Sequence, residues 1–218
     1  MLGIVIALES EAEILLEEME TFRVLTVSGK TVHVGRAFGK DVALVVCGVG
    51  KVNAALGTQL LVSKFDAEKL FNFGVAGGLN ASTKLCGVYQ IQAAVQFDFD
   101  LTQLNGTKIG TLDEYKENYL NLSSFQAPLA KKFLGTADRF NDSPDDYRLL
   151  TDTLKADIRD MEGAAVVQAA YAAQLAVYSV KAISDVAGSG STTEQYLKNR
   201  NKALQNLKTY LPTLLEEL

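Results

Sequence analysis

Short apolar runs alternate along the chain with stretches whose apolar residues recur at helical spacing. The first run, 3–8 (GIVIAL), predicts a strand buried on both faces, because it has no polar residue to face solvent. A helix over 10–19 is predicted to follow it, with Ser10 and Glu13 spaced as a capping box.

The remaining chain continues this alternation, and only 102–128 is polar and irregular throughout. Gly39 separates two alternating segments and predicts a hairpin turn. The further predicted strands are 30–38, 41–49, 69–77, 87–100, 131–140 and 176–183. The further predicted helices are 52–65, 143–154, 163–174 and one from Thr192 onward with a kink at Pro212.

No linker, repeat or low-complexity tract interrupts the pattern, so we expect one domain spanning 1–218. Strands that alternate with helices predict an α/β sandwich, and the hairpin makes its sheet mixed. In such sheets, ligands bind beyond the carboxyl ends of the strands. Residues at those ends are therefore the first candidates for function.

Composition narrows the function classes. The chain is 48% hydrophobic with a net charge of −5, and 1–22 has no Lys or Arg, so no nucleic-acid partner is expected. No apolar stretch approaches the roughly 18 residues of a membrane span, and the N-terminus lacks a signal-peptide pattern. Cys47 and Cys86 are expected to be buried, reduced thiols, which favours the cytoplasm. His33 is the only histidine, which disfavours a Ser-His-Asp triad or a histidine-rich metal site.

Three carboxylates follow predicted strands: Glu11, Glu162 and Asp185. A glycine-rich turn, 74–79 (GVAGGL), ends a fourth strand. If these ends share one edge of the sheet, they enclose a pocket with three acids and no histidine. Such a pocket suits a cationic reaction centre, of which an oxocarbenium-like sugar is the commonest example.

Each feature also has a structural reading. Glu11 lies in the first turn of a helix, where acids are favoured by the dipole, and Asp185 could form a turn. Glu162 could be a helix N-terminal acid near Arg159, although an unpaired buried carboxylate would cost several kcal/mol. The turn 74–79 could serve only close packing. Singly, none of these features decides the function.

Together, their order resembles the nucleoside phosphorylase/nucleosidase superfamily, and most of all its 5′-methylthioadenosine/S-adenosylhomocysteine nucleosidases. The most specific match is the Met161-Glu162 pair heading a small-residue helix, followed some 20 residues later by 182–185 (AISD). The resemblance implies a three-layer α/β/α sandwich with a central mixed, partly barrel-like sheet. The matching motifs are 3–16, 47–61, 72–79, 96–104, 160–167 and 181–187.

The resemblance also implies roles. Glu11 would activate the attacking water, Glu162 would bind the ribose 2′- and 3′-hydroxyls, and Met161 would pack on the sugar. Asp185 would be the general acid at purine N7, which requires a raised pKa. Further substrate-binding residues would be Phe140, which stacks on the purine, Asn141, whose backbone reads its edge, and Leu8, Val75, Ala76, Gly77 and Ser184.

No cofactor and no metal are implied, and the partners would be a small-molecule purine nucleoside and a second copy in a homodimer, with 97–104 near the interface.

Phosphorolysis is disfavoured, because 1–22 offers no cation and Val75 stands where phosphorylases carry a hydroxyl. Lys181, where arginine is expected, and Arg139 depart from the family pattern. The 5′-substituent stays open, as do a phosphorylase, a futalosine-type hydrolase and a non-catalytic purine-binding protein. The segment 47–51 (CGVGK) lacks both nucleotide-binding fingerprints, which disfavours nucleotide-triphosphate binding. A dehydrogenase is disfavoured because the glycine fingerprint of dinucleotide-binding folds is missing.

Overall fold

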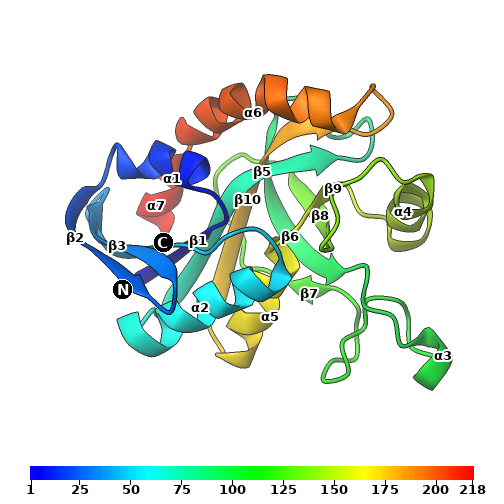
Figure 1. The fold of residues 1–218 in the computed structure, drawn as a ribbon, viewed down its shortest axis with the longest axis horizontal. Helices are drawn as coiled ribbons and strands as arrows, with labels where there is room; N and C mark the ends of the chain where they lie inside the picture. Colours follow the sequence, from blue (N-terminus) through cyan, green and yellow to red (C-terminus); the bar gives the residue numbers. More distant parts are fainter.

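A ten-stranded sheet forms the centre of the computed structural model, which describes residues 1–218 (Figure 1). The strands are β1 (Leu2–Ile6), β2 (Glu20–Val27), β3 (Lys30–Ala37), β4 (Lys40–Val46), β5 (Lys69–Gly78), β6 (Val88–Gln96), β7 (Leu120–Asn121), β8 (Lys131–Thr136), β9 (Ile158–Asp160) and β10 (Ala176–Val186). The helices are α1 (Glu9–Leu16), α2 (Lys51–Phe65), α3 (Thr102–Asn105), α4 (Pro144–Arg148), the π-helical turn η1 (Leu149–Leu154), α5 (Gly163–Ala172), α6 (Thr192–Lys208) and α7 (Leu211–Glu217).

The sheet is mixed and partly closed. Its order is β10-β6-β8-β9-β5-β1-β4-β3-β2, and β10 also pairs with β5. The five strands β5, β10, β6, β8 and β9 therefore form a closed, barrel-like ring. Strands β1, β4, β3 and β2 extend the sheet beyond β5 and leave it open at β2. This arrangement confirms the predicted α/β fold with a partly barrel-like mixed sheet.

Two apolar cores lie on opposite faces of the sheet. Helices α2 and α5 cover one face, and α1, α6 and α7 cover the other (Figure 1). Strand β1 contributes to both cores, with Val5 in the first and Ile4 and Ile6 in the second. Because both faces of β1 are covered, it needs apolar residues at every position, as its sequence shows. No helix is long and apolar enough to cross a membrane.

The structure corrects four local predictions. Strand β2 was not predicted, because its largely exposed residues lack a buried face. Helix α1 starts after Leu8, whose N–H donates to the Glu11 carboxylate (3.3 Å), so Ser10 and Glu13 form no capping box. The helix predicted over 143–154 splits into α4 and η1. The C-terminal helix is broken rather than kinked, since Pro212 occupies the first turn of the separate α7.

Candidate active site

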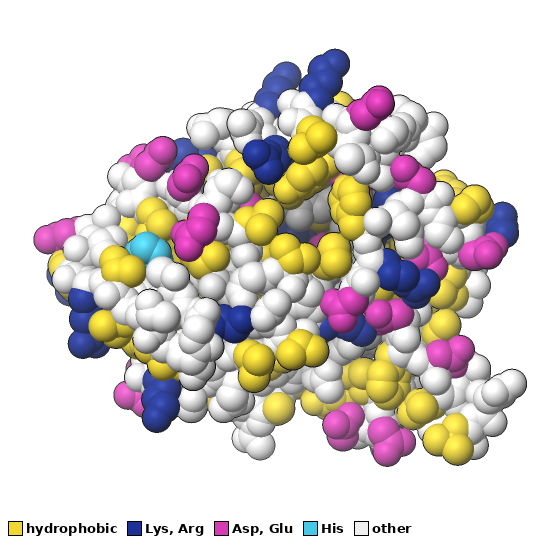
Figure 2. All heavy atoms as spheres, viewed as in Figure 1, with side chains coloured by type: hydrophobic (Ala, Val, Ile, Leu, Met, Phe, Trp, Pro, Cys, Tyr) yellow, Lys and Arg dark blue, Asp and Glu magenta, His cyan; other side chains and the backbone are white.

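A cavity of about 350 Å³ opens near the carboxyl ends of β1, β5 and β10. Figure 2 shows it as a hollow near the middle of one face, rimmed mainly by hydrophobic side chains. It is lined by all the site residues expected from the sequence except Asn141, whose backbone was expected to read the purine edge. The Asn141 side chain donates to Asp146 (2.9 Å). The residues brought together are Leu8, Glu11, Val75, Ala76, Gly77, Phe140, Met161, Glu162, Ser184 and Asp185.

Glu11 is a buried carboxylate held by backbone groups from two elements. Its Oε1 accepts a hydrogen bond from the Val75 N–H (2.8 Å), and its Oε2 accepts one from Leu8. Gly74 makes room for this carboxylate, because a Cβ there would lie 2.7 Å from Oε1. Burial raises the pKa of Glu11, while the Val75 N–H and the charge of Lys181 lower it in part.

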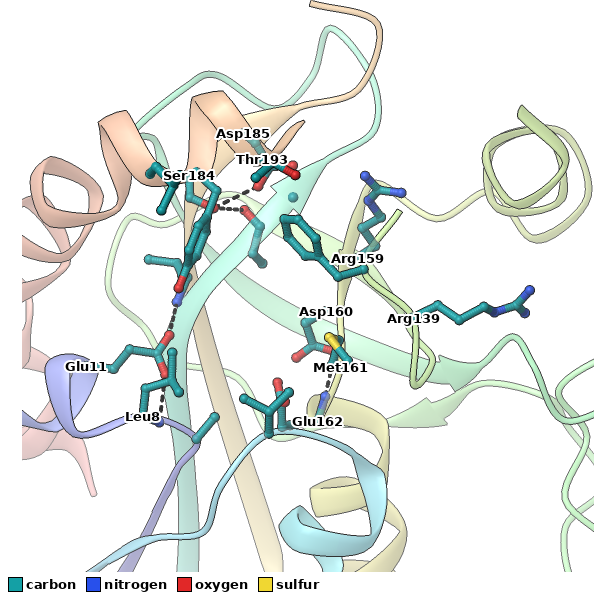
Figure 3. Close-up of a pocket in the computed structure, with 18 residues that line it drawn as sticks. Leu8, Glu11, Arg139, Arg159, Asp160, Met161, Glu162, Ser184, Asp185 and Thr193 are labelled. Carbon is teal, nitrogen blue, oxygen red and sulfur yellow. Dashed lines mark hydrogen bonds between the residues drawn. The ribbon is translucent and has the colours of Figure 1, made fainter. Parts of the chain in front are cut away.

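Glu162 precedes α5 and faces the same cavity (Figure 3). Its Oε1 accepts a hydrogen bond from the N–H of Gly50 (2.8 Å), the residue at the start of α2, whose φ of +100° favours glycine. Burial and then the negative charge of Asp160 raise the pKa of Glu162 to about 7. The carboxylate thus has a protein donor on one oxygen, and a ligand that donates to the other would favour its ionised form.

A buried ion pair lies beside these glutamates and was not predicted. Lys181 Nζ lies 2.9 Å from Asp160 Oδ2, with side-chain exposures of 3% and 2%. Burial alone would lower the pKa of Lys181, but the Asp160 carboxylate and the nearby Glu162 and Glu11 raise it above its ordinary value. Asp160 also accepts hydrogen bonds from the Thr136 hydroxyl and from the backbone N–H groups of Glu162 and Gly163.

Asp185 reaches the cavity through an irregularity in β10. The pairing register with β5 shifts between Ile183 and Asp185, so the consecutive residues Ser184 and Asp185 both line the cavity. A regular strand would send them to opposite faces. The Ser184 hydroxyl donates to Asp185 Oδ2 (2.8 Å), which leaves Oδ1 for another partner. Burial raises the pKa of Asp185, while the bond from Ser184 and the charge of Arg159 lower it in part.

Several cavity residues are not among the predicted site residues, although the sequence marked Arg139 as a departure from the family pattern. Arg139 and Arg159 line one side, and Thr193, Tyr196 and Leu197 contribute from α6. Tyr196 contacts the half-exposed Phe140 edge to face, with ring centroids 5.8 Å apart. The amphipathic pattern of α6 predicts that the helix packs against the core. It does not show that the first turns of the helix border a cavity.

This arrangement combines two chemical capacities. Asp185 has a raised pKa, so it can carry a proton to a bound group, and its free oxygen faces the cavity side of Gly77. Burial also raises the pKa of Glu11 and Glu162, and their backbone donors and the positive charge of Lys181 offset this effect in part. One cavity therefore brings together three carboxyl groups that can exchange protons or accept hydrogen bonds.

Comparisons with known proteins agree with this geometry. The sequence model of the phosphorylase superfamily matches residues 1–216. A 5′-methylthioadenosine/S-adenosylhomocysteine nucleosidase of Marinomonas sp. is 32% identical, over 90% of this chain and 91% of that protein. The structure of such a nucleosidase from Colwellia psychrerythraea 34H in complex with adenine is 27% identical, with a TM-score of 0.91 over 100% of this chain and 95% of that one.

The fold is shared more widely. The futalosine hydrolase of Helicobacter pylori superposes with a TM-score of 0.91, over 100% of this chain and 97% of that one, at 22% identity. That likeness concerns the fold alone, whereas the superfamily match and the Marinomonas relative concern the sequence as well. The chain therefore belongs to the phosphorylase superfamily and, within it, to the 5′-methylthioadenosine/S-adenosylhomocysteine nucleosidase family of N-ribosyl hydrolases.

Proposed function

We propose that this protein hydrolyses the N-glycosidic bond of 5′-methylthioadenosine and S-adenosylhomocysteine, releasing adenine and a 5-thio-substituted ribose. The observation that carries the proposal is the meeting of Glu11, Glu162 and Asp185 at one cavity. These residues come from three separate elements and lie up to 174 positions apart (185 minus 11). The family relatives that bear this activity in their names support the choice of substrate.

Asp185 is the general acid of the proposed reaction. As the C1′–N9 bond breaks, its electron pair passes into the purine, and Asp185 delivers its proton to N7 so that the base leaves neutral. Water adds to C1′, and Glu11 accepts the proton that the water loses. This division of roles needs one carboxyl group protonated and one ionised.

Glu162 binds the sugar. The 2′- and 3′-hydroxyls donate to its carboxylate and complete the hydrogen bonding begun by Gly50. Met161 packs on the ribose, and Phe140 stacks on the purine. The apolar cavity wall, including Leu8 and Val75, excludes water from the remaining surface of the nucleoside.

Water is favoured over phosphate as the nucleophile. The cation nearest to Glu11 and Glu162 is Lys181, which is already paired with Asp160. Val75 has no hydroxyl to donate to a phosphate, and the Glu11 carboxylate would repel it. Of the two arginines of the cavity, Arg159 lies near Asp185 over Gly77, where the proposal places the base, and Arg139 is paired with Asp146.

Turnover of methylthioadenosine with and without phosphate tests this function. We expect equal rates of adenine release without phosphate and with about 50 mM phosphate, a concentration above the KM values typical of enzymes. The sugar product should be free 5-methylthioribose. Detection of a sugar 1-phosphate, or a rate that depends on phosphate, would show a phosphorylase instead. Binding of the nucleoside with no base release would show a non-catalytic binding protein.

We also propose that the protein is a cytoplasmic homodimer whose interface includes an apolar stripe at the start of α2. Val49 precedes α2, and Val52 and Leu56 lie four residues apart on one face of it; the three side chains are 45%, 69% and 57% exposed. Val49 also lines the cavity, so a partner seated there would border the active site. The two cysteines are free and buried, as suits a reducing compartment.

Light scattering tests the dimer. We expect the mass of two chains for the parent protein and of one chain for Val52→Glu, because the buried charge would oppose association. Val24→Glu is the matched control, since Val24 is also exposed (55%) but lies on the distant edge strand β2. A parent protein that is monomeric at micromolar concentration would contradict the proposed interface.

A further inference from the structure

Three residues form a row across neighbouring strands at the base of the cavity. Gly77 of β5 pairs with Arg159 of β9 on one side and with Asp185 of β10 on the other. A Cβ on Gly77 would lie 2.9 Å from Asp185 Oδ1 and 3.2 Å from Arg159 Nε. The absence of a side chain at Gly77 thus lets the carboxyl and the guanidinium approach each other over the glycine, and both line the cavity (Figure 3).

The Arg159 guanidinium has no hydrogen-bond acceptor within the protein. Its nearest acid is Asp142, whose Oδ1 lies 4.0 Å from one Nη atom, beyond hydrogen-bonding distance. The Arg159 side chain is only 13% exposed, whereas that of Asp142 is 55% exposed. The five N–H donors of Arg159 therefore have only water of the open cavity as a partner, which a ligand that accepts hydrogen bonds would replace. The other arginine of the cavity, Arg139, already forms an ion pair with Asp146 (3.0 Å).

The position of Arg159 indicates which ligand atom would accept its hydrogen bonds. In the proposed reaction, Asp185 meets N7 of the purine, and the substituent nearest to N7 is the one on C6. An amino group there donates hydrogen bonds, so it suits the carboxyl of Asp185 but not a guanidinium. A carbonyl oxygen there accepts hydrogen bonds, so it suits Arg159.

We propose that Arg159 is a specificity-determining residue that donates to the C6 carbonyl oxygen of the base, so that the site also cleaves 6-oxopurine nucleosides. This inference rests on the proposed function, because it places N7 of the base at Asp185. The bonds broken and formed are the same as in the proposed cleavage of methylthioadenosine. The C1′–N9 electron pair passes to the base, N7 takes the proton of Asp185, and water adds to C1′ with loss of a proton to Glu11.

The test compares 5′-methylthioinosine with methylthioadenosine, two nucleosides that differ at C6 and in the protonation of N1. For the parent protein we expect kcat/KM values within about tenfold of each other. In Arg159→Met, the inosine-to-adenosine ratio of kcat/KM should fall by about 10- to 100-fold, since a hydrogen bond to a charged donor contributes that much. Arg159→Lys should restore part of the ratio. Asp142→Asn, which removes the neighbouring acid but keeps the donor, should leave the ratio unchanged.

Binding of the free bases gives a second readout that needs no turnover. Calorimetry should show hypoxanthine binding to the parent protein and weakened at least tenfold in Arg159→Met, with adenine affected less. A parent protein that cleaves methylthioadenosine but discriminates more than 100-fold against the 6-oxo substrate would overturn the inference and leave the proposed function standing. Equal losses for both bases in Arg159→Met would overturn it too. Cleavage of neither nucleoside would refute the proposed function, and the base affinities would still decide the role of Arg159.

Discussion

Asp185→Asn should lower kcat for methylthioadenosine by about 10²- to 10⁴-fold, the usual contribution of a positioned general acid. Asparagine keeps the size of the side chain and can still accept the hydrogen bond from Ser184, but it has no acidic proton for N7. Without that proton, the purine must leave as an anion. The measurement is the single-turnover rate of adenine release, which separates the chemical step from substrate binding.

The pH dependence supplies a control for this substitution. Burial raises the pKa of Asp185, and only its protonated form can act as the acid, so activity should be present below that pKa and fall as pH rises through it. The variant should lose this descending limb while still binding adenine. Near-native turnover in Asp185→Asn, with the limb intact, would assign the acid to another group.

Lys181→Met should lower the free energy of unfolding by about 3–5 kcal/mol, because it leaves the Asp160 carboxylate buried without its cation. Both side chains are almost fully buried, so water cannot replace the lost partner. For a domain of this size, the loss corresponds to a fall in Tm of roughly 6–20 °C. Differential scanning calorimetry at pH 7 measures it.

The double variant Asp160→Asn/Lys181→Met is the matched control. It removes both charges, and the amide oxygen of asparagine, placed at the Oδ1 position, can still accept the bonds from Thr136 and from the Glu162 N–H, so the double variant should recover part of the loss. The exposed pair Arg36–Asp41 provides a comparison, since Arg36→Met should change stability by less than about 1 kcal/mol. Equal effects at the two pairs would mean that burial does not control the strength of the Lys181 pair.

Local pattern predicted most of the elements, but not the closure of the sheet. Strands β1, β4, β5 and β10 are apolar runs, so their existence followed from the sequence. That β10 pairs with both β5 and β6 depends on contacts between residues such as Val180 and Gln90, far apart in the chain. Periodicity along a single segment contains no information about such pairings.

The sequence likewise predicted part of the candidate site and missed the rest. Glu11, Glu162 and Asp185 stood out because each is an acid beside an apolar segment, and the family resemblance supplied their order. Lys181 was recognised as unusual, but its partner Asp160 was not, since only the folded sheet brings β9 and β10 close enough for the pair. Arg159 was considered only as a neighbour of Glu162, whereas the row through Gly77 directs it toward Asp185.

The register shift at Ser184 makes the length of β10, and not only its residue types, a condition for function. Removing a single amino acid between Lys181 and Ser184 would turn the Asp185 side chain toward the opposite face of the strand, away from the cavity. Side-chain replacements in this stretch alter one contact each, whereas insertions and deletions displace Asp185, the proposed proton donor. Among descendants of this gene that keep the activity, the spacing between Lys181 and Asp185 should therefore be more constant than the residues that occupy it.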